Sequence, residues 1–319
     1  MACCHTAWFF FVILSAGNRA RKDAFMETIG FIGLGIMGRP MAANLVKGGF
    51  TVVGYDVVPQ SCQDAAGRGV TIAASVEALA AKCSIIIQML PTPAICVESA
   101  VEIAKHAKPG TLVLDMSSLS PMTAKQVHDL LAEKGVHMMD APVSGGEPKA
   151  VDGTLAIMIG GSREDYDRAL PVFKCMSSST ILVGKVGAGC IAKLANQIMV
   201  GVNIAAMGEA FTLAAKAGVD PSLVYEAVRY GLAGSTVLNQ KGPMILERNY
   251  NPGARMEIHI KDFVNVLDTA HSMSSPVPLT ASVMEMMQSL KANGMGQIDH
   301  GGVVRYYELI AGVEVKKGA

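Results

Sequence analysis

The chain has 319 residues, half of them hydrophobic, and its 27 basic residues balance its 27 acidic ones. That length predicts two domains with ample buried core. The balanced charge, without a basic stripe, argues against a nucleic-acid partner. The seven cysteines lack C-x-x-C spacing, which favours reduced thiols in the cytoplasm and predicts neither a disulfide framework nor a metal site.

Residues 1–25 differ from the rest of the chain. An apolar run, Trp8–Leu14, is followed by a basic cluster. The run is too short to cross a bilayer, and no Lys or Arg precedes it as in a signal peptide. It matches an Arg-rich mitochondrial presequence only in part. We interpret residues 1–25 as a non-native extension, place the natural start at Met26, and expect no membrane association.

The first predicted strand, Thr28–Ile32, runs directly into a glycine-rich turn and a helix. Gly33, Gly35 and Gly38 form the pattern G-x-G-x-x-G. The first glycine allows the turn, the second lets a pyrophosphate approach, and the third lets helix and strand pack closely. N–H groups at the helix start then face the phosphates. The turn predicts dinucleotide contacts from Gly33, Leu34, Gly35, Ile36, Met37 and Gly38.

The second predicted strand, Thr51–Tyr55, ends at Asp56. A carboxylate there can accept hydrogen bonds from ribose hydroxyls and repel a 2′-phosphate. Val57 and Val58 follow, with no arginine to bind a phosphate. This pattern favours NAD as cofactor, with NADP as the less favoured alternative. The other interpretation of Asp56 is a turn residue before Pro59.

The chain then alternates strands and helices as far as Gly187, which predicts a mainly parallel, doubly wound sheet. Short apolar runs, such as Ile85–Ile87, fit strands covered on both faces. The further predicted strands are Ser84–Leu90, Thr111–Asp115, His137–Asp140, Leu155–Ile159 and Thr180–Val183. Helices predicted between them include Ser61–Ala66, Val76–Ala81, Pro121–Lys134 and Arg163–Met176.

After Gly187 the sequence predicts helices alone. The first, Gly189–Gly218, is almost wholly apolar and is predicted to be buried. The others are Pro221–Tyr230, Ile260–His271, Leu279–Ala292 and Val303–Gly312. The predicted fold is α/β: an N-terminal Rossmann-type doubly wound sheet over residues 26–187, then an all-α domain over 188–319 for substrate binding and oligomerisation.

Lys193 is the only charged residue between Lys185 and Glu209. An unpaired ammonium in apolar surroundings is costly, so this lysine must reach a cleft, a partner or a ligand. It is as consistent with a lysine that snorkels to the surface or forms a buried ion pair as with a catalytic acid. A lysine with a pKa lowered by burial can protonate a carbonyl that receives hydride.

Two strand ends carry polar residues, as expected where ligands bind in open α/β sheets. Asp115 to Ser118 follow one strand, and Asp140 to Gly146 follow another. Ser144 with the Gly145 and Gly146 amides could hold a carboxylate. The other interpretation of both segments is ordinary serine- and glycine-rich turns, and that of Lys261-Asp262 is a solvated helix start.

These motifs together resemble the β-hydroxyacid dehydrogenase family, which includes 3-hydroxyisobutyrate dehydrogenases. The resemblance rests on the glycine turn, Asp115-Met116-Ser117-Ser118, the segment Asp140–Gly146, and Gly187-Ala188-Gly189 four residues before Lys193. It runs from about Thr28 to the C-terminus. Segments in both halves are most similar to the family's bacterial tartronate semialdehyde reductases: Gly145–Ala150, Lys193–Gln197, Gly231–Leu238 and His259–Asp262.

The resemblance implies roles for individual residues. Lys193 matches the catalytic lysine, and Ser144, Gly145 and Gly146 match the substrate-carboxylate loop. Ser118 matches a residue between substrate and nicotinamide. Met89, Leu90 and Pro91 match a segment lining the cofactor cleft, and Lys261 a lysine beside the cofactor. Many members have asparagine four residues after the lysine. Here that position is Gln197, with Asn196 before it, which puts the substrate-orienting role there in doubt.

The resemblance also implies an activity: NADH-dependent reduction of tartronate semialdehyde to glycerate in bacterial glyoxylate or aldarate metabolism, by a cytoplasmic homodimer or homotetramer with its active site between the domains. The alternative within this class is 3-hydroxyisobutyrate dehydrogenase or another 3-hydroxyacid dehydrogenase. A non-catalytic NAD-binding protein is the alternative from another class.

Overall fold

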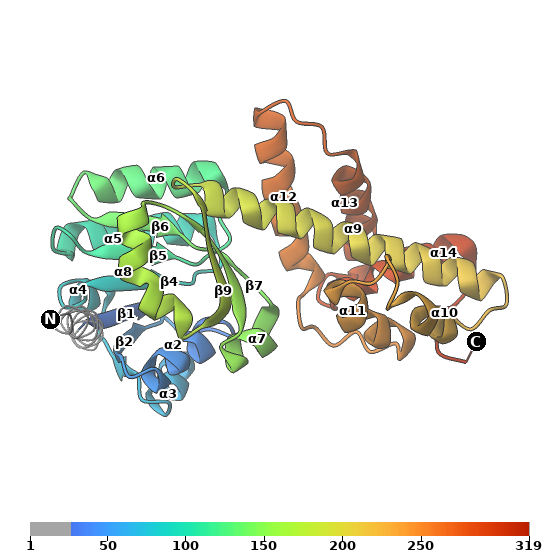
Figure 1. Cartoon of the computed structure of the whole chain (residues 1–319), viewed down its shortest axis with the longest axis horizontal. Coiled ribbons are helices and arrows are strands. Elements are labelled where there is room, and N and C mark those ends of the chain that lie inside the picture. Colours follow the sequence, from blue (N-terminus) through green and yellow to red (C-terminus); the bar gives the residue numbers. More distant parts are fainter. Residues whose placement is uncertain (1–26, 319) are drawn as a thin grey trace, which may run out of the picture. The chain divides into compact units, whose positions relative to one another are not determined.

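The computed structural model describes residues 27–318, so the extension predicted over residues 1–25 lies outside the described residues. The chain divides into two compact units, the first ending at Ile191 and the second beginning at Ala192 (Figure 1). The division falls inside one long helix, close to its start.

The first unit alternates strands and helices, as predicted. Its strands are β1 (Thr28–Ile32), β2 (Thr51–Tyr55), β3 (Thr71–Ile72), β4 (Ile85–Gln88), β5 (Leu112–Asp115), β6 (His137–Asp140), β7 (Val143–Ser144), β8 (Leu155–Gly160) and β9 (Ser177–Gly184). Its helices are α2 (Gly38–Lys47), α3 (Pro59–Ala66), α4 (Val76–Ala80), α5 (Pro93–His106), α6 (Pro121–Ala132), α7 (Gly146–Asp152) and α8 (Arg163–Lys174).

The nine strands form one sheet in the order β3-β2-β1-β4-β5-β6-β8-β7, with β9 beside β8. From β3 to β6 every pairing is parallel, whereas β8 pairs antiparallel with both β6 and β7. The strand order reverses between β1 and β4. In doubly wound sheets ligands bind beyond the carboxyl ends of the strands at such a reversal.

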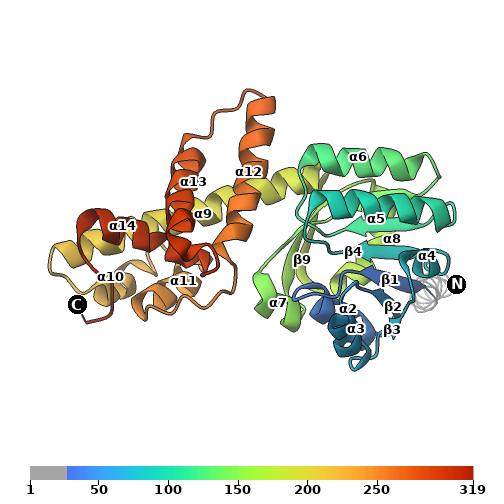
Figure 2. The same cartoon turned by 180° about the vertical axis from the view of Figure 1, so that it is seen from behind.

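Helices cover both faces of this sheet (Figures 1 and 2). Successive residues of the central strands point to opposite faces, as strand geometry requires. Ile85 and Ile87 enter one core with α2 and α8, whereas Ile86 enters the other core with α5 and α6. The continuous apolar runs therefore reflect burial on both faces, as predicted.

The second unit is helical. It contains α9 (Ala188–Lys216, begun in the first unit), α10 (Pro221–Val228), α11 (Thr236–Leu246), α12 (Met256–Ser272), α13 (Pro278–Leu290), η1 (Lys291–Met295), η2 (His300–Val303) and α14 (Val304–Ala311). The first half of α9 packs in a core with α12 and α13, and its second half packs with α10, α11 and α14. Together with the parallel sheet, this confirms the predicted fold class.

Helix α9 is less buried than its composition predicted. Met199 and Leu213 are 66% and 71% exposed. Among the described helices, α9 alone has the length and apolar composition of a membrane span. Part of α9 packs into the two helical cores, whereas apolar side chains such as Met199 and Leu213 stay exposed.

Several short elements were not predicted. Strands β3 and β7 have two residues each, too few to show a periodic pattern. Helix α12 was predicted, but it begins at Met256, four residues before the predicted start at Ile260. Helices α7 and α11 were also missed. Gly145 precedes α7, and Pro243 lies inside α11, so both sequences carry residues that usually mark turns.

Candidate active site

The glycine turn follows β1 at the predicted position, and its glycines meet different surroundings. Gly33 has φ of +93°, and a Cβ there would run into the Met89 carbonyl oxygen. A Cβ on Gly38 would strike the Gly33 carbonyl oxygen and lie 3.0 Å from the Phe31 ring. The first and third glycines are therefore required by the turn and by the packing of α2 on β1.

Gly35 differs, because a Cβ there would meet nothing within 4 Å. Gly35 and the neighbouring Ile36 are exposed, whereas Leu34 is buried in the core. The protein itself thus sets no requirement for glycine at this position. Close approach of a ligand to the backbone would set such a requirement, as a pyrophosphate at the start of α2 would.

Asp56 follows β2 and faces the glycine turn. Its carboxylate accepts a hydrogen bond from the Leu34 N–H at 2.6 Å and another from the Val58 N–H at 2.8 Å. It is therefore more than a turn residue before Pro59, because it ties the end of β2 to the turn. Two carboxylate oxygens have about four acceptor sites, so capacity for ribose hydroxyls remains.

The segment Met89-Leu90-Pro91 follows β4, next to β1 in the sheet. The Met89 N–H donates to the Ile32 carbonyl at 2.9 Å, and the Leu90 N–H donates to the Ser117 hydroxyl at 3.0 Å. Ser117 is buried, whereas Ser118 is half-exposed. Ser117 was not predicted as a site residue, and it supports the segment, leaving Ser118 as the accessible serine of the pair.

The predicted carboxylate loop lies between β7 and α7. Gly145 has φ of +137°, and a Cβ there would lie 2.6 Å from the Lys149 side chain. Gly146 has φ of +70°, so both positions favour glycine sterically. Ser144 ends β7 and is half-buried. The loop's shape thus follows from its glycines, and their N–H groups stand at the start of a short helix.

Asp115 and Asp140, expected to offer polar atoms above the sheet, are instead buried at 1% exposure. Asp140 accepts hydrogen bonds from the Gly187 and Cys190 N–H groups, both at 2.7 Å, at the start of α9. Asp115 accepts from the Gln88 amide and from the Ser117 N–H. Burial raises the pKa of both carboxyls. Both carboxylates are therefore buried and bind the loops that follow their strands, rather than standing exposed above the sheet.

Lys193 lies in the second turn of α9 within the helical unit. Burial lowers the pKa of Lys193, the Asp262 carboxylate opposes that shift, and the Lys261 ammonium adds to it. A lysine with a lowered pKa exchanges a proton more readily near neutral pH.

Three predicted site residues, and Asp262 next to one of them, lie together around this lysine. The Gln197 amide donates to Asp262 at 2.7 Å, and the Asn196 amide donates to the Gln197 side-chain oxygen at 2.9 Å. Lys261 is 3.4 Å from Asp262 and about one-third exposed. Asp262 is 4% exposed, so Lys261-Asp262 is not the solvated helix start considered from sequence. Asp262 is the site residue that sequence reasoning missed. Its place three residues after His259, on the buried face of α12, was the available signal.

The predicted site residues thus form two groups. Residues of the glycine turn, Asp56, the Met89 segment, Ser118 and the Ser144 loop belong to the first unit, at carboxyl ends of strands or just beyond. Lys193, Asn196, Gln197 and Lys261 belong to the helical unit.

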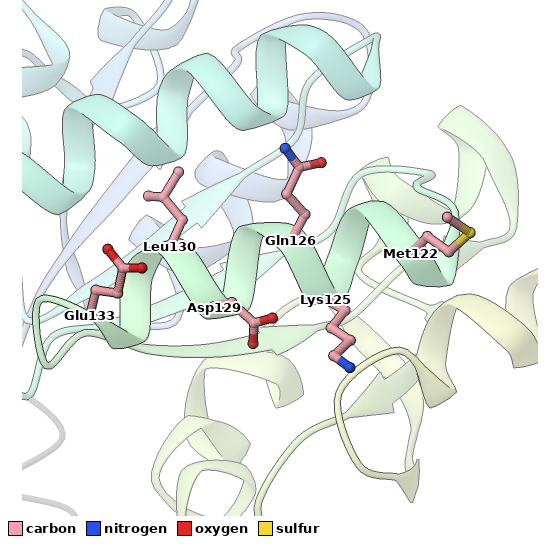
Figure 3. Close-up of a pocket in the computed structure, with 6 residues that line it drawn as sticks. All are labelled: Met122, Lys125, Gln126, Asp129, Leu130 and Glu133. Carbon is pink, nitrogen blue, oxygen red and sulfur yellow. The ribbon is translucent and has the colours of Figure 1, made fainter.

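A surface hollow of about 610 Å³ lies elsewhere, along α6 (Figure 3). It is lined by Met122, Lys125, Gln126, Asp129, Leu130 and Glu133. These side chains come from α6 and from Glu133, which follows it, and none of them is a predicted site residue. The hollow therefore includes none of the predicted site residues.

Comparison with known proteins matches both units. Residues 28–184 match the NAD binding domain of 6-phosphogluconate dehydrogenase, and residues 187–307 match the NAD-binding family of NADP-dependent 3-hydroxyisobutyrate dehydrogenase. The chain is 37% identical to 2-hydroxy-3-oxopropionate reductase of Escherichia coli, over 89% of this chain and 98% of that protein. It is 34% identical to L-threonate dehydrogenase of Cupriavidus necator, over 88% and 96%.

A solved structure gives the same family. Mycobacterium tuberculosis 3-hydroxyisobutyrate dehydrogenase with L-serine is 31% identical and superposes with a TM-score of 0.83, covering 88% of this chain and 98% of that one. The relatives' names differ in substrate but agree in acting on hydroxyacids or their oxo forms. The glycine turn, the lysine on α9 and these matches identify the chain as a member of the β-hydroxyacid dehydrogenase family related to 3-hydroxyisobutyrate dehydrogenase, an NAD(P)-dependent oxidoreductase acting on the CH–OH group of hydroxyacids.

Proposed function

We propose that this enzyme reduces tartronate semialdehyde (2-hydroxy-3-oxopropanoate) to glycerate, with NADH as the reductant and Lys193 as the general acid. The observation that carries the proposal is the cluster of Lys193, Gln197 and Asp262 in the helical unit. The choice of substrate is supported by 37% identity, across nearly the whole chain, to a protein named for that reaction.

Substrate recognition in this proposal uses both groups of residues. Ser144 and the Gly145 and Gly146 N–H groups hold the substrate carboxylate, because oriented amides bind anions well. Asn196 and Gln197 hydrogen-bond the remaining oxygens of the substrate. Gln197 is held by Asp262, so its amide is oriented before the substrate arrives.

Lys193 supplies the proton. When bound, the reduced nicotinamide supplies the hydride that the aldehyde carbon receives. As the C=O double bond opens, the Lys193 ammonium stabilises the developing alkoxide and transfers a proton to it, giving the primary alcohol of glycerate. Lys193 is left neutral and regains its proton from solvent. In the oxidative direction the neutral amine takes the hydroxyl proton.

The preference for NADH over NADPH rests on Asp56, whose carboxylate faces the glycine turn, and on Val57 and Val58, which offer a 2′-phosphate no cation. Asn196, Gln197 and Lys261 complete the proposed site from the helical unit, with Ser118, Met89, Leu90 and Pro91 from the first. We place the enzyme in the cytoplasm.

A homodimer or homotetramer is part of the proposal. Large apolar side chains are exposed on α9 and α14, among them Met199, Leu213 and Ile310 at 66%, 71% and 69%. A second copy covering them would remove this apolar surface from water. Light scattering after gel filtration measures the mass, and a monomer at micromolar concentration contradicts this part.

The experiment that tests the activity is a substrate panel assayed with NADH and with NADPH. Tartronate semialdehyde is expected to give the highest kcat/KM. Lys193→Ala is expected to lose most turnover, by about 100-fold or more, while still binding NADH. Lys216→Ala is the matched control, because Lys216 ends the same helix and is exposed. Near-normal kcat in Lys193→Ala removes Lys193 from the mechanism.

The second candidate is 3-hydroxyisobutyrate dehydrogenase, favoured by the 31% identical structural relative with that name. Its substrate carries a methyl group where tartronate semialdehyde carries a hydroxyl. A higher kcat/KM for methylmalonate semialdehyde would select this candidate. No oxidation of NADH with any semialdehyde would instead favour a non-catalytic NAD-binding protein.

A further inference from the structure

We propose that His259 is a positioning residue for the reaction: it holds the backbone carbonyl of Gln197, and His300 fixes the imidazole tautomer that can do so. The proposal rests on the proposed roles of Lys193 and Gln197. His259 and His300 are 41 residues apart in sequence and lie in the helical unit, on α12 and at the start of η2.

Helix α12 holds Gln197 at two points. The His259 Nε2 is 3.2 Å from the Gln197 backbone carbonyl, and Asp262, three residues later on α12, accepts from the Gln197 side-chain amide at 2.7 Å. The spacing of three puts His259 and Asp262 on one helical face. Backbone and side chain of Gln197 are therefore both fixed by α12. Lys193 lies one turn earlier on α9, on the same face as Gln197.

Gly201 makes this contact sterically possible. A Cβ on Gly201 would lie 2.9 Å from the His259 Nε2 and would collide with the Phe263 ring. The Phe263 ring meets the His259 ring edge-to-face, with centroids 4.7 Å apart. His259 itself is 2% exposed. The imidazole therefore packs against α9 at Gly201, one turn after Gln197, where no side chain intervenes.

The hydrogen-bond pattern allows a single arrangement of protons. A carbonyl oxygen only accepts, so the His259 Nε2 must carry the hydrogen. A neutral imidazole then has an unprotonated Nδ1, which can only accept. The His259 Nδ1 is 2.8 Å from the His300 Nδ1, so His300 must donate from its Nδ1. His300 therefore selects the His259 tautomer that binds Gln197, as second partners of histidine commonly do.

The surroundings keep both rings neutral. Burial lowers the pKa of His259 to about 4 and that of His300 to about 3. The charged groups facing the pair are Asp262 on α12, Lys193 on α9, Lys241 on α11 and Asp299 before η2. Asp299 binds the Lys241 ammonium at 2.8 Å and the Gly301 N–H at 2.8 Å, which fixes the loop that carries His300. At neutral pH the pair holds one shared hydrogen between the two Nδ1 atoms.

Two substitutions at His300 separate positioning from general stability. His300→Leu removes the donor to His259, whereas His300→Asn offers a side-chain amide N–H near the lost Nδ1. In His300→Leu we expect kcat for reduction to fall about 10-fold, the loss that one hydrogen bond accounts for, with the NADH dissociation constant unchanged. In His300→Asn we expect most of that kcat to return. His259→Gln and His259→Leu form a second pair, because glutamine can still donate to the Gln197 carbonyl.

Nitrogen-15 NMR of the imidazole rings reads the tautomer directly and needs no turnover. Wild-type His259 is expected to be protonated at Nε2 alone, and His300→Leu to shift it towards a mixture of tautomers. Wild-type kcat in folded His300→Leu, or an equal loss in His300→Asn and His300→Leu, overturns the proposal. Protonation of wild-type His259 at Nδ1 also overturns it. If the wild-type enzyme reduces no semialdehyde, the proposed function fails, and the NMR measurement still decides the pairing.

Discussion

The Gln197 side-chain amide donates a hydrogen bond of 2.7 Å to the Asp262 carboxylate. The two residues lie 65 positions apart on α9 and α12. Asp262 is also the anion that opposes the lowering of the Lys193 pKa. One carboxylate thus orients the amide expected to bind substrate and sets the charge around the lysine expected to supply the proton.

Asp262→Asn is expected to move the basic limb of the pH profile for reduction to lower pH. The carboxylate raises the Lys193 pKa against the effect of burial, so its removal lowers that pKa further. Reduction requires protonated Lys193, and the protonated fraction is then lost at lower pH. The measurement is kcat/KM for the semialdehyde against pH at saturating NADH.

Lys261→Gln is the counterpart, because the Lys261 ammonium lowers the Lys193 pKa. Its basic limb is expected to move to higher pH. If the basic limb moves in the same direction in both variants, or moves in neither variant, Lys193 is excluded as the titrating acid.

Gly38→Ala and Gly35→Ala are expected to separate folding from cofactor binding. A Cβ on Gly38 strikes the Gly33 carbonyl, which is backbone and cannot swing aside, so we expect a loss of about 1–3 kcal/mol in the free energy of unfolding. Gly35→Ala meets no protein atom within 4 Å, so its stability should stay close to wild type. Its NADH affinity should fall about 10-fold or more, equivalent to ~1.4 kcal/mol.

Chemical denaturation and NADH fluorescence titration measure the two effects. Unchanged NADH affinity in Gly35→Ala would contradict the placement of the pyrophosphate at this turn.

Asp56→Ala is expected to weaken NADH binding more than NADPH binding. The carboxylate faces the turn, where it would accept from ribose hydroxyls and repel a 2′-phosphate. We expect the ratio of the two dissociation constants to change about 10-fold in favour of NADPH. Asp56→Asn is the control, because it removes the charge and keeps one acceptor oxygen for the Leu34 N–H. An unchanged ratio in both variants would remove Asp56 from ribose recognition.

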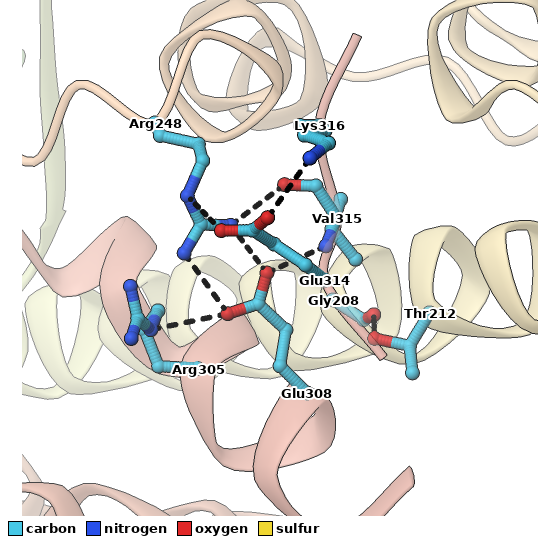
Figure 4. A network of polar contacts seen from close by, with 8 residues as sticks. All are labelled: Gly208, Thr212, Arg248, Arg305, Glu308, Glu314, Val315 and Lys316. Carbon is cyan, nitrogen blue, oxygen red and sulfur yellow. Dashed lines mark hydrogen bonds and ion pairs between the residues drawn. The ribbon is translucent and has the colours of Figure 1, made fainter. Parts of the chain in front are cut away.

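Glu308→Ala is expected to destabilise the helical unit strongly. Glu308 is 7% exposed, forms ion pairs with Arg248 and Arg305, and accepts the Val315 N–H at 2.6 Å (Figure 4). We expect a loss of about 1–3 kcal/mol in the free energy of unfolding, because the buried Val315 N–H loses its acceptor, Arg305 loses its ion pair and Arg248 keeps only Glu314. Lys316→Ala is the comparison, since Lys316 pairs with Glu314 at the surface of the same network. Urea denaturation measures the stability of both variants. A Glu308→Ala midpoint equal to that of Lys316→Ala would show that the contacts of Glu308 add no stability.

Much of the nucleotide-binding unit could be predicted because its signals are local. Ile85, Ile86 and Ile87 alternate between two buried faces, so an apolar run of that length already indicates a strand within a covered sheet. The glycine turn is likewise read from adjacent residues, since backbone angles and close packing at Gly33 and Gly38 leave room for glycine alone. Family membership followed from the same motifs, and the comparisons confirm it.

The sequence by itself thus determined the alternation of strands and helices followed by helices alone, the fold class, the NAD(P) turn and the lysine on α9. Only the tertiary structure decided which groups surround that lysine. The partner of Gln197 lies 65 residues away and that of His259 lies 41 away, and no short-range pattern encodes such pairs. Asp140 offered the same ambiguity, because a carboxylate at a strand end can face a ligand or bind the next helix. The fold selected the second role, because Asp140 accepts hydrogen bonds from the Gly187 and Cys190 N–H groups at the start of α9, and Asp262 is buried where it accepts from the Gln197 amide.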